Sequence, residues 1–338
     1  MKFDPFKTAN VIRDTFRSYT AKTFFINDPE LQDEFQEELN SFPISNGPFI
    51  ESPNSFKQGR SIRELVDEGV FSTEFNTLMQ NQEGILTRPL YAHQEKAIRL
   101  IESGRNAVVT TGTGSGKTEC FLYPILDSLL KEKENGTLNP GVRVLLLYPM
   151  NALISDQMER LRNMLKDYPD ITFGAYNGNT EETTEKALEN FKTLHNGMEP
   201  TRNELISRYQ MIQTPPHILI TNYSMLEYLM LRPRENVFFS GKYSKAWKYI
   251  VLDEAHTYSG ATGMEVSMLL RRLYHTLENK SNVRFILTSA TLGDENADSE
   301  ICDFARRLCA DSSFEPSDII RAERVLIDTP SDTISASD

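Results

Sequence analysis

Apolar residues recur at two different spacings along the chain. Near the N-terminus they come every three or four residues, as in "TANVIRDTFRSYT" and "PELQDEFQEELNSF", which is the spacing of one helix face. A loop rich in Pro, Gly, Ser and Asn follows at 41–59, and "SIRELVDEGV" predicts a further short helix. We therefore expect residues 1–85 to form a mostly helical N-terminal accessory segment.

From residue 86 onward the pattern changes. Short runs that are apolar throughout alternate with helical stretches such as "TECFLYPILDSLLKEKE" and "GMEVSMLLRRLYHTLEN". Strands that are apolar on both faces and joined by helices predict an α/β fold, with a parallel sheet flanked by helices. The six predicted strands are 106–111, 142–149, 171–176, 217–222, 248–254 and 284–290.

The same pattern sets the expected domain boundaries. Alternating strands and helices fill residues 86–312, which we expect to be the main domain. Within it, the charged stretch at about 178–215 is longer than a crossover needs, which predicts a surface insertion. Residues 313–338 lose all periodicity and end in "TPSDTISASD", so we expect a linker or tail there.

Composition narrows the class of protein. A chain of 338 residues with 39% hydrophobic residues is large enough for one large or two modest globular domains. No apolar run approaches the ~20 residues that span a bilayer, and the N-terminus lacks the apolar core of a signal peptide. The three cysteines, Cys120, Cys302 and Cys309, fit neither a zinc site nor a disulfide framework. We therefore expect a cytoplasmic protein with no membrane contact.

The formal net charge of −12 has the wrong sign for a protein that binds nucleic acid over its whole surface. Six acidic residues and no basic residue lie within 27–39. This run fits the solvated face of a helix, and a docking surface for a protein partner is the alternative. Because much of the surplus lies in one segment, a basic groove elsewhere stays compatible with the sequence.

A glycine-rich loop follows the first predicted strand of the main domain, in "AVVTTGTGSGKTE". Glycines let successive backbone N–H groups turn toward an anion, and the next helix adds its positive end. A lysine at this place contacts β- and γ-phosphates, and the following hydroxyl binds Mg²⁺. The usual pattern starts with Gly, and Thr111 stands there in this chain. The predicted nucleotide-binding residues are Thr111, Gly112, Thr113, Gly114, Ser115, Gly116, Lys117, Thr118 and Glu119, with Thr118 as a metal ligand.

Two adjacent carboxylates follow a later apolar strand, in "YIVLDEAH". Adjacent residues leave a strand in different directions, so one carboxylate can face a metal while the other faces a reacting phosphate. We predict that Asp253 holds Mg²⁺ and that Glu254 orients and deprotonates the attacking water. Lys117, Asp253 and Glu254 are thus the candidate catalytic residues.

With these motifs in this order, the chain resembles the superfamily 2 helicases of the DExH/D-box type. "LYAHQEKAI" (90–98) is similar to their adenine-reading Q motif, "GTGSGKT" to motif I, "DEAH" to motif II and "TSAT" to motif III. The resemblance implies a RecA-like P-loop nucleoside-triphosphatase domain that hydrolyses ATP with Mg²⁺. It also implies that nucleic acid is a partner.

The resemblance assigns further roles, residue by residue. Gln94 would hydrogen-bond the adenine edge, with Tyr91 or Arg88 near the ring. For His256 the resemblance implies a coupling role within the catalytic group, with an ordinary histidine at a helix start as the alternative. Ser289 and Thr291 would link the nucleotide to the strand-binding face. "YPMNALISDQ" and "ITNYSMLEYLM" resemble strand-contacting segments. Their candidate phosphate contacts, each with loop capping as the alternative, are Met150, Asn151, Thr221, Asn222 and Ser224.

The longer phrases "LLLYPMNALISDQMERL" and "VLDEAHTYSGATGMEVSMLLRRL" are similar to the YprA-like branch, near RecQ and Lhr. That resemblance implies an ATP-dependent DNA helicase or translocase acting on single-stranded DNA, or on a duplex with a single-stranded tail. It implies a role in DNA repair or phage defence. The family also has a second RecA-like domain, but only about 45 residues follow "TSATLG". We therefore expect that domain in cis or in trans, and weak activity from this chain alone.

Two other functions stay open at the sequence level. One is an RNA-directed ATPase of the same fold, and the other is a nucleotide-binding subunit of a defence complex that moves no strand. Arg271 and Arg272 suit a solvated helix face, with strand contact or partner docking as the alternative. We expect Trp247, the one tryptophan of the chain, in the core.

Overall fold

The structure, a computed structural model, describes residues 4–45, 54–112, 114–290, 297–309, 311 and 313–325. The chain forms two compact units, Met1–Asn54 and Ser55–Asp338. The predicted boundary at residue 85 therefore falls inside the second unit. Residues 55–85 belong there because side chains such as Leu65 and Phe75 are completely buried in its core.

The first unit is a pair of helices, α1 (Pro5–Thr23) and α2 (Pro29–Ser41), as the apolar spacing predicted. Each begins at a proline preceded by an aspartate whose side chain accepts hydrogen bonds from the first turn. Proline suits the first helical position and aspartate suits the cap. The acidic residues of 27–39 are exposed, with Asp28 serving as the cap of α2.

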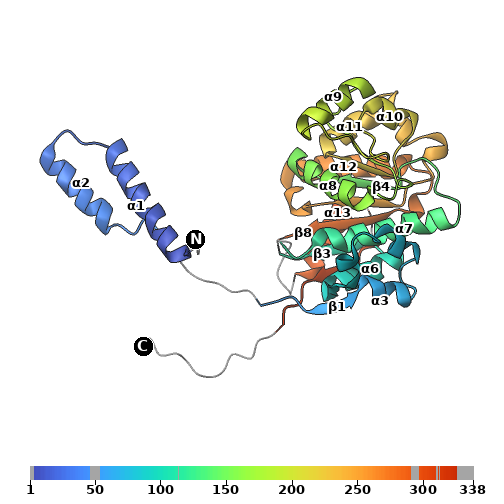
Figure 1. The fold of residues 1–338 in the computed structure, drawn as a ribbon, viewed down its shortest axis with the longest axis horizontal. Helices are drawn as coiled ribbons and strands as arrows, with labels where there is room; N and C mark the ends of the chain where they lie inside the picture. Colours follow the sequence, from blue (N-terminus) through green and yellow to red (C-terminus); the bar gives the residue numbers. More distant parts are fainter. Residues whose placement is uncertain are drawn as a thin grey trace. The chain divides into compact units, whose positions relative to one another are not determined.

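The second unit is built on a seven-stranded sheet with the order β5-β6-β4-β7-β8-β3-β9 (Figure 1). Every neighbouring pair of strands is parallel. All six strands predicted from the sequence are present. They are β3 (Ala107–Thr110), β4 (Val144–Leu147), β5 (Phe173–Ala175), β6 (Ile218–Thr221), β7 (Tyr249–Leu252) and β8 (Arg284–Ser289).

The seventh strand, β9 (Ile319–Arg321), corrects the expectation of a linker at 313–338. It adds to the edge of the sheet beside β3, and Ile320 is buried there. Three residues are too few to show a strand period, so the sequence pattern did not reveal it.

Alternate strand residues point to opposite faces of the sheet, and each face has its own core. Val144 and Leu146 of β4 pack with α6, α7 and α8, whereas Leu145 and Leu147 pack with α11, α12 and α13. This explains why the strands are apolar throughout. The helices of the two layers are α6 (Ala92–Glu102), α7 (Lys117–Glu134), α8 (Asn151–Leu165), α11 (Tyr223–Leu231), α12 (Gly260–Thr276) and α13 (Asp298–Cys309).

Shorter elements complete the second unit. An antiparallel pair, β1 (Gln58–Ser61) and β2 (Pro89–Tyr91), leads into α6. Within 178–215 lie two helices, α9 (Thr184–Leu194) and α10 (Arg208–Gln213). The remaining helices, all short, are α3 (Ile62–Asp67), α4 (Glu74–Leu78), α5 (Glu83–Thr87) and the 3-10 turns η1 (Glu235–Phe238), η2 (Gly241–Tyr243), η3 (Ala255–Thr257), η4 (Lys280–Asn282) and η5 (Pro316–Asp318).

Trp247 lies in the core as expected. It is fully buried, stacks on Phe239 with 5.5 Å between ring centroids, and donates its indole N–H to the Phe238 carbonyl at 3.0 Å. No helix in the described ranges is long and apolar enough to cross a membrane.

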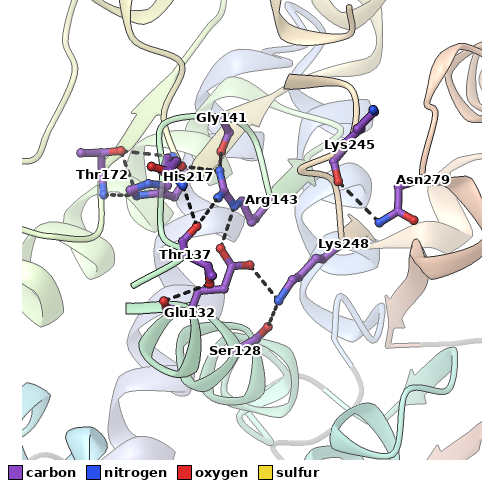
Figure 2. Close-up of polar contacts among 11 residues, drawn as sticks. Ser128, Glu132, Thr137, Gly141, Arg143, Thr172, His217, Lys245, Lys248 and Asn279 are labelled. Atoms are coloured by element: carbon purple, nitrogen blue, oxygen red, sulfur yellow. Dashed lines mark hydrogen bonds and ion pairs between the residues drawn. The ribbon is translucent and has the colours of Figure 1, made fainter. Parts of the chain in front are cut away.

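Charged side chains tie the amino-terminal ends of β4 and β7 to α7 (Figure 2). Arg143 donates to Glu132 at 3.0 Å, and Lys248 reaches the other carboxylate oxygen of Glu132 at 2.7 Å. His217 is buried close by, and its Nδ1 accepts the Thr172 backbone N–H at 2.9 Å. Burial, together with the positive charge of Arg143, lowers the pKa of His217 from 6.5 to about 4.

This shift predicts a pH-dependent stability. Above about pH 6.5 the imidazole is neutral in the folded and unfolded chain alike, so it adds no dependence. Between 6.5 and about 4 only the unfolded chain takes up the proton, so the free energy of unfolding falls as the pH falls. The total loss is about 3 kcal/mol. Urea denaturation at stepped pH values measures it.

His217→Asn is the informative variant, because its side-chain oxygen can still accept the Thr172 N–H while the titrating group is gone. We expect the unfolding free energy of the variant to fall less steeply over this pH range than that of the wild type. His195→Asn, on the surface of α9's C-terminus, is the control. Parallel curves for wild type and His217→Asn would contradict the prediction.

Candidate functional site

The phosphate loop connects the end of β3 to the start of α7. Thr111 and Ser115 are both buried, and their hydroxyl oxygens lie 2.6 Å apart, which holds the two ends of the loop together. Gly116 caps α7 with φ +73°, a conformation that favours glycine. Thr113 lies outside the described residues. Lys117 is the first residue of α7, where the helix presents its unpaired N–H groups.

Lys117 and Glu254 meet although 137 residues separate them. The ammonium group donates to Glu254 Oε1 at 3.1 Å, and only 11% of the lysine and 24% of the glutamate side chain are exposed. Lys117 is the predicted phosphate-binding residue, and Glu254 is the predicted general base. Their side chains are therefore in direct contact at the carboxyl-terminal edge of the sheet.

Asp253 and Glu254 follow β7, the neighbour of β8 in the sheet. Glu254 adopts φ +49°, one of two non-glycine positive values in the described residues. Such strain is found where the fold holds a functional side chain in place. The Glu254 N–H donates to the Thr288 hydroxyl at 3.3 Å, and that hydroxyl donates to Asp253 Oδ1. Burial raises the pKa of Asp253 above its usual range, and the Thr288 bond opposes the rise.

Thr288 is a site residue that the sequence analysis missed. It is fully buried at the end of β8 and fixes both carboxylate residues. Thr288 belongs to the "TSAT" motif, but the resemblance assigned roles only to Ser289 and Thr291 of that motif. Thr291 lies outside the described residues.

The oxygen donors of this site suit Mg²⁺. Asp253 supplies a desolvated carboxylate and Thr118 a hydroxyl, and both are hard ligands. Within the described ranges, no group of three or more His, Cys, Asp and Glu could form a metal cage.

His256 lies where it can couple the two motifs. Its Nδ1 is 3.1 Å from the Ser289 hydroxyl and 3.4 Å from Glu254 Oε2. Ser289 is buried at the end of β8. One imidazole therefore contacts both Glu254 of "DEAH" and Ser289 of "TSAT".

The predicted adenine-binding residues lie at the start of α6. Gln94 uses its amide to join two backbone groups, donating to the Gly116 carbonyl at 3.1 Å and accepting the Tyr91 N–H at 2.9 Å. Tyr91 packs on Phe56 with 5.1 Å between ring centroids. Arg88 is exposed at the end of α5. Glu119 pairs instead with Arg160 at 2.9 Å.

The predicted nucleic-acid residues lie at the same edge of the sheet, where α8 and α11 begin. Met150 and Ser224 are exposed, and Asn222 donates to Asn151 Oδ1 at 3.0 Å while capping α11. Thr221 departs from the prediction, because it is fully buried and its hydroxyl donates to the Tyr176 carbonyl at 2.6 Å. Its side chain is therefore not available to a phosphate.

A separate groove of about 1340 Å³ lies between α11, α12 and α13. None of the phosphate-loop or DEAH residues lines it, and its lining is largely apolar. Arg272 lies there and pairs with Glu227 at 2.7 Å, while Arg271 is exposed on the same helix. The groove is therefore not the nucleotide site.

A phosphate loop after β3, an Asp-Glu pair after β7 and a parallel sheet between two helical layers define the class: a RecA-like P-loop nucleoside triphosphatase. Comparison with known proteins gives the family. The model of the DEAD/DEAH box helicase family matches residues 91–299, and the chain belongs to that family.

Individual relatives agree with this assignment. The chain is 31% identical to the Druantia protein DruE of Escherichia coli, over 85% of this chain and 20% of that protein. It is 31% identical to the uncharacterized ATP-dependent helicase YprA of Bacillus subtilis, over 61% of this chain and 23% of that protein. The crystal structure of the helicase MrfA bound to DNA matches with a TM-score of 0.59 and 26% identity, over 80% of this chain and 31% of that one. The chain thus spans about a fifth of the length of these two curated relatives.

Proposed function

We propose that this chain is the ATP-hydrolysing motor domain of a cytoplasmic DNA helicase or translocase, which acts together with a second RecA-like domain supplied in cis or in trans. The observation that carries the proposal is the 3.1 Å contact between Lys117 and Glu254 at the sheet edge. It brings a phosphate-binding cation and a general base to one place.

The residues would divide the work as follows. Backbone N–H groups of the phosphate loop and Lys117 hold the β- and γ-phosphates. Thr118 and Asp253 would hold Mg²⁺, which would neutralise charge on the phosphates. Glu254 exchanges its bond with Lys117 for one with water, and then orients and deprotonates that water. Gln94 and Tyr91 would bind the adenine.

Nucleic acid would lie across the starts of α8 and α11. Met150, Asn151, Asn222 and Ser224 line this edge, and helix N-termini bind phosphates through backbone N–H groups. Such contacts read the sugar-phosphate backbone and not the base sequence. The DNA-bound structure of MrfA supports DNA as the partner, and a role in DNA repair or phage defence belongs to the same proposal.

Filter binding of single-stranded DNA and of RNA with the same sequence tests the partner. We expect tighter binding of DNA, and an affinity that falls steeply as salt rises, because phosphate contacts release counterions. Asn222→Ala should weaken binding, whereas Asn190→Ala, exposed on α9, should not. Equal or tighter binding of RNA would favour the RNA-directed ATPase. A flat salt dependence would favour the subunit that moves no strand.

A further inference from the structure

A buried histidine beside the phosphate loop has no role in the candidate site described above. His93, the second residue of α6, is 1% exposed, and its Nε2 lies 2.8 Å from the Ser115 carbonyl oxygen of the phosphate loop. A carbonyl can only accept, so Nε2 carries the hydrogen and donates it. Nδ1 is buried and has no hydrogen-bond partner among the described residues.

The surroundings of His93 hold the ring in place and keep it neutral. The imidazole stacks on Tyr91 at 5.6 Å and meets the edge of Phe56 at 5.4 Å. Burial in this aromatic setting lowers the pKa of His93, which keeps the ring neutral. The His93 ring is therefore held in place and donates its hydrogen bond in one fixed direction.

His93 and Gln94 hold two consecutive carbonyls of the loop. His93 donates a hydrogen bond to the Ser115 carbonyl, and Gln94 donates one to the Gly116 carbonyl at 3.1 Å. The approach is close, since a Cβ at Gly116 would lie 2.2 Å from Gln94 Nε2.

Because the peptide bond is planar, holding a carbonyl in place also sets the direction of the N–H group that follows it. In a planar trans peptide the C=O and the following N–H point in opposite directions. With the Ser115 and Gly116 carbonyls tied to α6, the N–H groups of Gly116 and Lys117 point away from α6. These are loop amides that a phosphate would bind.

We propose that His93 is a positioning residue of the phosphate loop, which by holding the Ser115 carbonyl directs the Gly116 amide toward the nucleotide phosphates. This inference rests on the nucleotide site proposed above. It places a histidine donor beside the Gln94 amide, which holds the neighbouring Gly116 carbonyl.

Three variants test it in the full chain. His93→Gln places an amide donor near the position of Nε2. His93→Asn has the same chemistry but is one methylene shorter. His93→Phe fills the aromatic space without a donor. His195→Phe is the matched control, because His195 also packs on an aromatic ring, that of Phe191 at 4.2 Å. Thermal unfolding confirms that each variant is folded.

The readout is displacement of a fluorescent ATP analogue by ATP, ADP and AMP. We expect His93→Asn and His93→Phe to lower the affinity for ATP and for ADP by about tenfold, the usual effect of leaving a buried carbonyl unpaired. The affinity for AMP should fall much less, because AMP lacks the β- and γ-phosphates. His93→Gln should bind ATP nearly as the wild type does. If His93→Phe does not fold, the comparison of Gln with Asn carries the test.

Wild-type ATP affinity in His93→Phe or in His93→Asn would overturn the proposal. So would an equal loss in His93→Gln and His93→Asn, or an equal loss for AMP and ATP, which would indicate packing alone. If Lys117→Ala also leaves ATP binding intact, the nucleotide site itself is wrong. If only the His93 variants behave as wild type, this inference alone fails.

Discussion

Replacing Lys117 with alanine is expected to lower the affinity of the chain for ATP by about a hundredfold. Losing one partner of a buried charge pair costs a few kcal/mol, which corresponds to a factor of this size. The variant also leaves Glu254 without its partner at 3.1 Å, so a carboxylate then faces the incoming phosphates. Both effects act in the same direction. Titration of a fluorescent ATP analogue measures the loss.

Lys192→Ala is the matched control for this experiment. Lys192, on α9, also pairs with a glutamate, Glu199 at 2.9 Å, but both side chains are exposed to solvent. We expect its ATP affinity to equal that of the wild type. ATP binding that persists undiminished in Lys117→Ala would remove the basis of the proposed function.

Glu254→Gln separates binding from chemistry. We expect ATP to bind at least as tightly as to the wild type, because a neutral amide does not repel the γ-phosphate. Hydrolysis should fall by about 10²–10⁴-fold, the usual contribution of a positioned general base. Single-turnover phosphate release measures it.

The control is Glu199→Gln, which removes a carboxylate from the surface pair and should leave turnover unchanged. The result that contradicts the assignment is a Glu254→Gln variant with normal hydrolysis. A variant that neither binds nor hydrolyses ATP would instead indicate that Glu254 supports the loop through its bond to Lys117.

Contiguous patterns determined much of this protein. Six of the seven strands of the main sheet, helices such as α7 and α12, and the order of the phosphate loop and Asp-Glu pair followed from the sequence, because each is encoded within a few neighbouring residues. The resemblance to DExH/D-box helicases followed from the same short stretches, and the match to the family model confirms it. The burial of Trp247 was also predicted correctly.

Only the tertiary structure decided which of these residues meet. Thr288 reaches Asp253, His93 reaches Ser115, and Lys117 reaches Glu254 across large separations in the chain, which no local period reports. The structure also placed residues 55–85 in the core, turned Thr221 inward and added β9 to the sheet edge. These features depend on long-range packing, where side chains far apart in sequence compete for the same buried space, so they appear only when the whole sheet is assembled.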